Sequence, residues 1–152
     1  MKWIKLIVVF SLLFVSACGG NDKASVAPVA SNLVTSPGTY VAPYLGSSTG
    51  NDSGHIDIDM TCGATSPIKG IFTFSSASPI SNCFVNSYKP DGTRFRSCSL
   101  SAFSLQGSDV NGLITVDIPI DVMVKGTHSY TITISDSQGS SSNQLIGTLI
   151  VE

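Results

Sequence analysis

Alternation of apolar and polar residues with a period of two dominates the chain from residue 55 onward. In HIDIDMT, residues 55–61, the apolar residues Ile56, Ile58 and Met60 alternate with polar ones. This pattern is typical of a β-strand with one buried face. Similar runs follow as KGIFTFS, NCFVNSY, TRFRSCSL, GLITVDIPID, SYTITIS and QLIGTLIV, separated by turn-forming segments such as SASP, KPDG and SDSQGSSS. The sequence therefore predicts an all-β, antiparallel β-sandwich of about seven strands over residues 55–152.

Length and charge narrow the possible classes. The chain has 152 residues, enough for one domain, and only 12% of them are charged. Two of its eight basic residues, Lys2 and Lys5, lie in the segment that we interpret below as a removable signal. The remaining chain then has six basic and ten acidic residues, a formal charge of −4. Nucleic acid is not an expected partner, because phosphate binding needs a basic patch.

The N-terminal segment has the three parts of a signal peptide. Lys2 and Lys5 form a positive region, and apolar residues 6–15 follow, a run too short to span a bilayer. Val15, Ser16, Ala17 and Cys18 come next: an aliphatic residue, two small residues and a cysteine. This order resembles the lipobox of bacterial lipoproteins. The resemblance implies a signal peptide over residues 1–17 and lipidation of the Cys18 thiol, whose thiolate is the nucleophile for a thioether.

The lipobox resemblance also implies a location. In lipoproteins of this kind, cleavage before the cysteine exposes an amino group that is commonly acylated, for example with palmitate. Two or more acyl chains on Cys18 would anchor the protein stably to a membrane. An Asp after the lipidated cysteine retains enterobacterial lipoproteins at the inner membrane, and this chain has Gly19 there. We therefore expect an outer-membrane lipoprotein, on either the periplasmic or the surface face.

Residues 18–54 are rich in Gly, Ser, Ala, Pro and Asn and lack lasting periodicity, so we expect a flexible linker. Within it, residues 39–45, TYVAPYL, are compatible with an edge strand, because Pro43 is tolerated only at an edge. Residues 46–50, GSSTG, match the G-x-S-x-G pattern of hydrolases. No helix-forming run follows Ser48, so we interpret the match as a chance product of composition.

The last third of the chain carries a second resemblance. Residues 126–139, GTHSYTITISDSQG, resemble the penultimate strand and following turn of bacterial immunoglobulin-like and PKD-like domains, and residues 78–93 resemble their middle strand and P-D-G turn. The resemblance implies that the Tyr130 hydroxyl bonds back across the strand's corner. The tryptophan of that family is missing, because the only Trp is Trp3 in the signal.

Three cysteines remain after Cys18, namely Cys62, Cys83 and Cys98, in an oxidising compartment. If Pro90 and Asp91 form a two-residue turn, Lys89 faces Gly92 and Cys83 faces Cys98. We therefore predict a Cys83–Cys98 disulfide. Pairing of Cys62 with either partner remains the alternative. The cysteine left over is expected to be buried or, alternatively, to pair with another molecule.

Candidate metal ligands and catalytic groups have simpler interpretations. His55, Asp57 and Asp59 lie on one face of the predicted strand 55–61, where a solvated polar face explains them. Asn51 and Asp52 keep weak calcium binding open. We expect Asp136 to cap its turn and His128 to be structural.

We therefore expect a non-catalytic binding or structural module of a bacterial envelope, with no cofactor and with a protein or glycan partner. The alternative is an accessory lipoprotein of a secretion or pilus assembly machine, and a small hydrolase using Ser48 is a third class. Three segments are the predicted contact surfaces: the C-terminal run QLIGTLIVE as a free sheet edge, and the loops 89–93 and 136–143.

Overall fold

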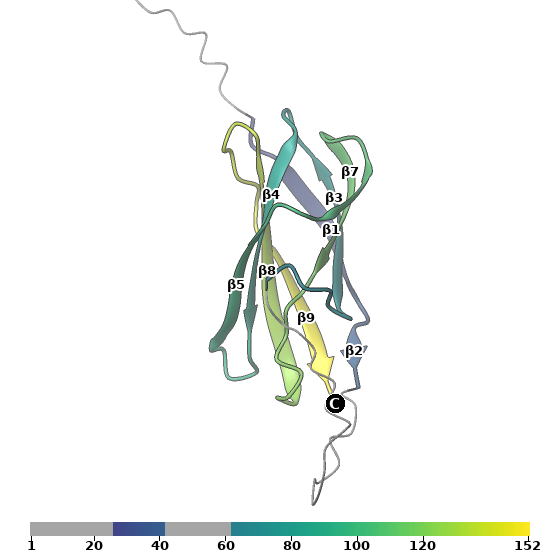
Figure 1. The fold of residues 1–152 in the computed structure, drawn as a ribbon, viewed down its shortest axis with the longest axis vertical. Coiled ribbons are helices and arrows are strands. Elements are labelled where there is room, and N and C mark those ends of the chain that lie inside the picture. Colours follow the sequence, from purple (N-terminus) through teal and green to yellow (C-terminus); the bar gives the residue numbers. More distant parts are fainter. Residues whose placement is uncertain (1–25, 42–61) are drawn as a thin grey trace, which may run out of the picture.

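The computed structural model describes residues 26–41 and 62–152, which form two β-sheets packed face to face (Figure 1). These residues contain no helix, so the prediction of an all-β sandwich is confirmed. The nine strands are β1 (Val29–Ser36), β2 (Thr39–Tyr40), β3 (Lys69–Ser75), β4 (Ile80–Tyr88), β5 (Arg94–Leu100), β6 (Ser104–Gly107), β7 (Asn111–Asp117), β8 (Gly126–Asp136) and β9 (Leu145–Val151).

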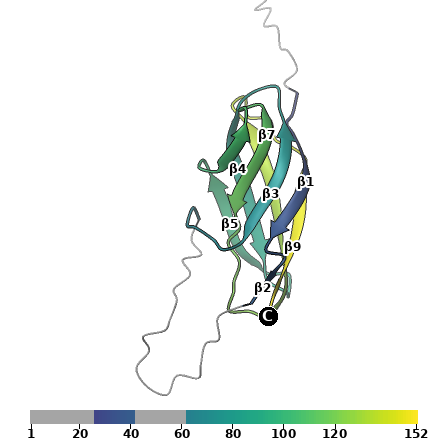
Figure 2. The same cartoon turned by 90° about the vertical axis from the view of Figure 1, so that its right-hand side faces the viewer.

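The strand order of both sheets is that of an immunoglobulin-type sandwich. One sheet has the order β1-β3-β7-β6 and the other has the order β2-β9-β8-β4-β5. When the strands other than β2 are lettered along the chain from A (β1) to G (β9), the two sheets read A-B-E-D and G-F-C-C′. β2 is added beside strand G. All pairs are antiparallel except β2 and β9, which run parallel. Figure 2 shows the four-stranded sheet from outside, with β7, β3 and β1 across the front.

Alternation builds the core most regularly in β8. Its inward residues His128, Tyr130, Ile132, Ile134 and Asp136 are all buried, and its outward residues are all Ser or Thr. Inward residues of both sheets meet them, among them Phe72, Val85, Ile114 and Leu149. Because the period is two, one buried face per strand is enough to assemble this core.

Tyr130 connects the two sheets. Its ring lies against Gly147 on the neighbouring strand β9, where an added Cβ would come within 2.3 Å of the tyrosine Cζ. Its hydroxyl is 2.7 Å from Thr35 Oγ1 on β1, which lies beside β9 at one lateral edge (Figure 2). The predicted bond back across the corner is therefore wrong, because the ring extends over Gly147 toward the opposite sheet.

Two strands, β1 and β6, were not among those predicted. β1 and β2 both lie within residues 18–54, so that segment is not a linker throughout and the sandwich begins at Val29. β2 does form an edge strand, as expected for residues 39–45, over Thr39 and Tyr40. The predicted strand 55–61 lies outside the described residues.

Candidate functional site

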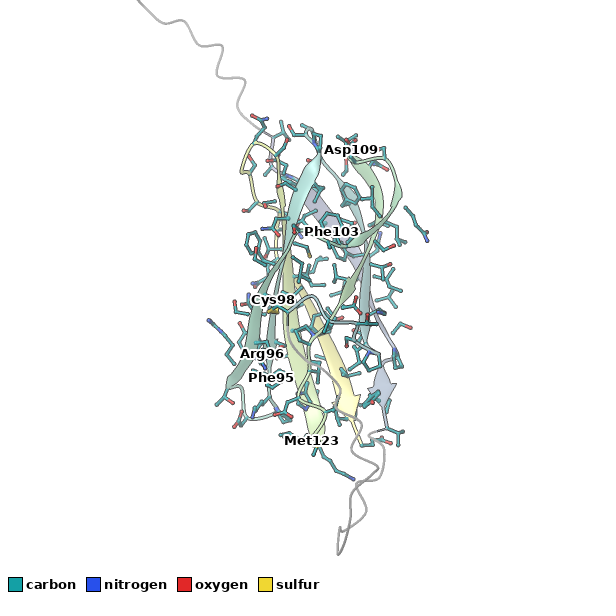
Figure 3. The ribbon with its side chains drawn as sticks, in the orientation of Figure 1. Phe95, Arg96, Cys98, Phe103, Asp109 and Met123 are labelled. Carbon is teal, nitrogen blue, oxygen red and sulfur yellow. A yellow bond between two sulfur atoms is a disulfide. The ribbon has the colours of Figure 1, made fainter. Side chains whose placement is uncertain are left out.

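The disulfide joins Cys62 to Cys98, with their Cα atoms 5.4 Å apart, so the predicted Cys83–Cys98 pair is wrong. Cys98 lies near the middle of the domain on β5 (Figure 3) and is buried. Cys83 is a free cysteine in the core, and burial raises the pKa of its thiol to about 12. The thiol therefore stays protonated at neutral pH and does not act as a nucleophile.

Two irregularities in the β4–β5 hairpin explain the different pairing. Gly92 donates its N–H to Lys89 O (2.9 Å), and Lys89 donates to Thr93 O (2.8 Å), so the turn contains three residues instead of two. Gly92 takes the positive φ of 80° that this turn needs. A bulge beyond Ser87 shifts the register once more, and Cys83 then faces Leu100. Cys83 and Cys98 become diagonal neighbours, roughly 7–8 Å apart, which is too far for a disulfide.

Asp136 caps its turn as expected. One carboxylate oxygen, Oδ1, accepts the N–H groups of Gln138 (3.0 Å) and Ser140 (2.8 Å). His128 is fully buried, and its Nε2 lies 2.6 Å from the carbonyl oxygen of Val124, which can only accept. Nε2 therefore carries a proton and the ring holds the loop before β8, which supports a structural role. Within the described residues, no three His, Cys, Asp or Glu side chains gather as a metal site requires.

Several sequence candidates lie outside the described residues. They are Cys18, Ser48, Asn51, Asp52, His55, Asp57 and Asp59.

Each of the three predicted contact segments makes some hydrogen bonds within the domain, and their contact with a partner stays a prediction. β9 is not a free edge along its whole length, because β2 pairs with Ile150 and Val151. Loop 89–93 is a tight turn in which the hydroxyl and N–H of Thr93 hold the pKa of Asp91 below its ordinary value. In loop 136–143, the Asn143 amide bonds both the N–H and the C=O of Ala30, each at 2.9 Å, and so caps the edge of β1.

A shallow pocket of about 520 Å³ lies on the outer face of the four-stranded sheet. Two rows of side chains that cross the strands form its walls. One row places Ser31, Thr73, Leu113 and Gln106 side by side, from β1, β3, β7 and β6. The other row consists of Val29, Ser75 and Asn111. Between the rows, Phe74 faces Gly112, and because Phe74 is buried in the core, mainly backbone forms the floor.

A β-bulge borders this pocket on β1. The register shifts between Ser31 and Val34, and Asn32 adopts a left-handed φ of 56°. Asn32 donates from its amide to Thr73 Oγ1 (3.0 Å), and Thr73 Oγ1 also lies 3.0 Å from Ser31 Oγ. This small network holds the bulged strand against β3. Bulges commonly lie next to functional sites, where they redirect side chains.

The side chains that line the pocket are suited to an uncharged ligand. No ionisable side chain is among its lining residues. The amides of Gln106 and Asn111 make no hydrogen bond to other parts of the described chain, so both are open to a ligand. Val29, 58% exposed, adds an apolar contact. The volume is within the range of roughly 300–1,000 Å³ typical of small-molecule sites.

Sequence reasoning missed this pocket. Val29 and Ser31 lie in the segment interpreted as linker, and Gln106 lies in a strand that was not predicted. Asn111 lies in a segment predicted as a turn, and the other lining residues lie in predicted strands whose sequence gave no reason to select them. The pairing register of four strands is what brings them together.

No protein-family model matches the chain, and no curated protein is significantly similar to it. Within residues 26–41 and 62–152 there is no helix with the length and apolar character needed to cross a membrane.

Proposed function

We propose that this protein is a lipid-anchored lipoprotein of the bacterial outer membrane whose immunoglobulin-like, PKD-related sandwich is a non-catalytic binding module. The pocket on the outer face of the four-stranded sheet is the observation that carries the binding role. Its amides, hydroxyls and aliphatic groups are suited to holding a ligand in one orientation. The same groups are poor acids, bases and nucleophiles at neutral pH without activation by a charged neighbour.

The anchor rests on sequence. Residues 15–18, VSAC, follow a positively charged and then an apolar segment, the order of a lipoprotein signal. The sandwich begins at Val29, so ten residues separate it from Cys18. A domain joined to a lipidated cysteine by so short a segment stays close to the membrane.

Labelling with radioactive palmitate and membrane fractionation test the anchor. We expect label in the wild-type protein and recovery with the outer membrane. Cys18→Ser should lose both, because serine has no thiol to form the thioether and no other cysteine directly follows the VSA segment. Label that persists in Cys18→Ser, or an unlabelled wild-type protein, would contradict the lipoprotein assignment.

Photo-crosslinking in intact cells tests the binding role. A photoreactive amino acid that replaces Gln106 lies in the pocket, whereas one that replaces the exposed loop residue Gln138 lies outside it. We expect a discrete adduct from position 106 and none from position 138, because the proposal places the ligand in the pocket and not on the loop 136–143 that the sequence had suggested. Equal adducts from both positions, or none from either, would argue against a ligand at the pocket.

The accessory lipoprotein of a secretion or pilus machine is the competing proposal. Protease treatment of intact cells separates the two roles in part, because cleavage requires display on the surface. An adduct from position 106 that contains a component of an assembly machine would favour the accessory role.

A further inference from the structure

We propose that the pocket on the outer face of the four-stranded sheet binds an uncharged glycan through Gln106 and Asn111. This inference rests on the proposed function only in taking the sandwich as a binding module, and it adds the chemical class of the ligand. Three features of the pocket support this ligand class: its lining side chains are uncharged, its polar groups point away from the sheet, and paired backbone forms its floor.

The lining matches a neutral ligand with many hydroxyl groups. Two amides, Gln106 and Asn111, come from β6 and β7, and hydroxyl groups of Ser31, Thr73 and Ser75 come from β1 and β3. Each amide offers both donors and an acceptor, and each hydroxyl can act as either. Sugar hydroxyls have the same dual character, so the two amides and the Ser75 hydroxyl can pair with a glycan, whereas the Thr73 hydroxyl is already bonded to Ser31 and Asn32. A charged ligand would find no ionised partner among the lining side chains.

The floor of the pocket argues against an extended peptide. Peptide recognition on a sheet usually adds a strand, which needs free backbone N–H and C=O groups at an edge. Here β3 and β7 lie under the pocket and are already paired with each other, Phe74 opposite Gly112. A ligand must therefore be recognised by side chains that point away from the sheet. One row crosses four strands and the other crosses three, and the longer row has a width on the order of 14 Å, which suits a short oligosaccharide segment.

The Ser31–Val34 bulge gives the pocket one pre-formed wall. Asn32, Thr73 and Ser31 are held together by their own hydrogen bonds, so these side chains are already ordered before a ligand arrives. A pre-ordered site loses less conformational entropy on binding. The open amides on the opposite side then provide the contacts that a ligand can complete.

Affinity electrophoresis of the full-length Cys18→Ser protein tests the proposal independently of lipidation. The gels contain dextran, laminarin or hydroxyethylcellulose as neutral polysaccharides, and alginate as an anionic one. We expect slower migration in at least one neutral gel, and at least tenfold weaker retardation for the double variant Gln106→Ala/Asn111→Ala. Gln138→Ala, which changes an exposed amide outside the pocket, should stay within twofold of the parent protein.

Nuclear magnetic resonance on the parent protein gives a second test that needs no variant. Titration with oligosaccharides of the retarding polysaccharide should shift the side-chain amide signals of Gln106 and Asn111, whereas that of Gln138 should not move. Any of four results would overturn the proposal: no retardation in any neutral gel, retardation by alginate alone, equal loss in Gln138→Ala, or shifts confined to other surfaces. A protein adduct at position 106 without glycan retardation would assign the pocket to a protein and also overturn it, while leaving the binding role intact.

Discussion

Replacing Gly147 by alanine is expected to destabilise the domain, because the new methyl group would clash with the side chain of Tyr130. The new Cβ would come within 2.3 Å of Tyr130 Cζ, 2.5 Å of its hydroxyl oxygen and 2.7 Å of Cε1. Tyr130 is fully buried, so its ring cannot swing into solvent. The ring must shift within a packed core, and it then loses the 2.7 Å hydrogen bond to Thr35 Oγ1.

The expected destabilisation follows from three contributions. Overpacking of a core costs about 1–3 kcal/mol. Loss of the hydrogen bond adds about 0.5–1.5 kcal/mol. Replacing a strand glycine by alanine stabilises the folded state by about 0.5–1 kcal/mol, because alanine loses less backbone entropy on folding. The free energy of unfolding should therefore fall by about 2–3 kcal/mol. The melting temperature should fall by roughly 10 °C for a domain of this size.

Thermal and urea unfolding followed by circular dichroism measure this effect. Gly38→Ala is the matched control, because an added Cβ at Gly38 meets nothing within 4 Å, and it should be neutral. In a Tyr130→Leu background, where the ring is absent, Gly147→Ala should cost less than about 1 kcal/mol. A Gly147→Ala protein as stable as the wild type, or an equal loss in both backgrounds, would refute the reasoning.

Three further predictions concern the cysteines and Asp136. The Cys62–Cys98 disulfide has a sequence separation of 36 residues, so Cys62→Ser should lower the free energy of unfolding by about 4 kcal/mol. Non-reducing peptide mapping that found Cys83 in a disulfide would contradict the pairing. Cys83 should add no pH dependence to stability between neutral pH and about pH 9, and stability should then fall as pH rises toward 12, because the unfolded state releases the Cys83 proton near the ordinary thiol pKa of 9.0, while the folded state retains it to about 12. Cys83→Ala should flatten this slope in urea titrations at several pH values, leaving the contribution of Tyr130, whose pKa burial also raises. Asp136→Ala should cost about 1–3 kcal/mol, because the N–H groups of Gln138 and Ser140 lose their acceptor; an Asp136→Ala protein that unfolds at the wild-type urea midpoint would show that the cap contributes little.

Alternation in sequence predicts those strands that bury one face regularly. Residues 129–135 were predicted as a strand and lie within β8, because every second residue of this stretch enters the core. β1 escaped prediction because the bulge at Asn32 interrupts its alternation and proline lies near both of its ends. β6 escaped because none of its four residues is buried. Alternation in the sequence arises because one face of a strand is buried, so a strand with few buried residues shows little alternation.

Register is harder to predict than strand position. One extra residue in the turn at Gly92 and one bulge beyond Ser87 together moved Cys83 opposite Leu100, and this changed the disulfide. The P-D-G sequence is compatible with a turn of either length, and the bulge has no strong local signature. The candidate pocket depends on register in the same way, because it consists of residues from four strands that only pairing aligns. Positions on strands were therefore predictable, whereas contacts between strands were not.

The early start of β1 limits where the pocket can meet its ligand. If Cys18 is embedded in a membrane through its lipid, the ten residues before Val29 extend to at most about 40 Å, whatever their conformation. A linker that lasted to residue 54 would reach about 120 Å. Val29 itself lines the pocket, so the pocket shares this limit. Its ligand must then be found in a thin layer next to the membrane, and a target beyond that layer would be out of range.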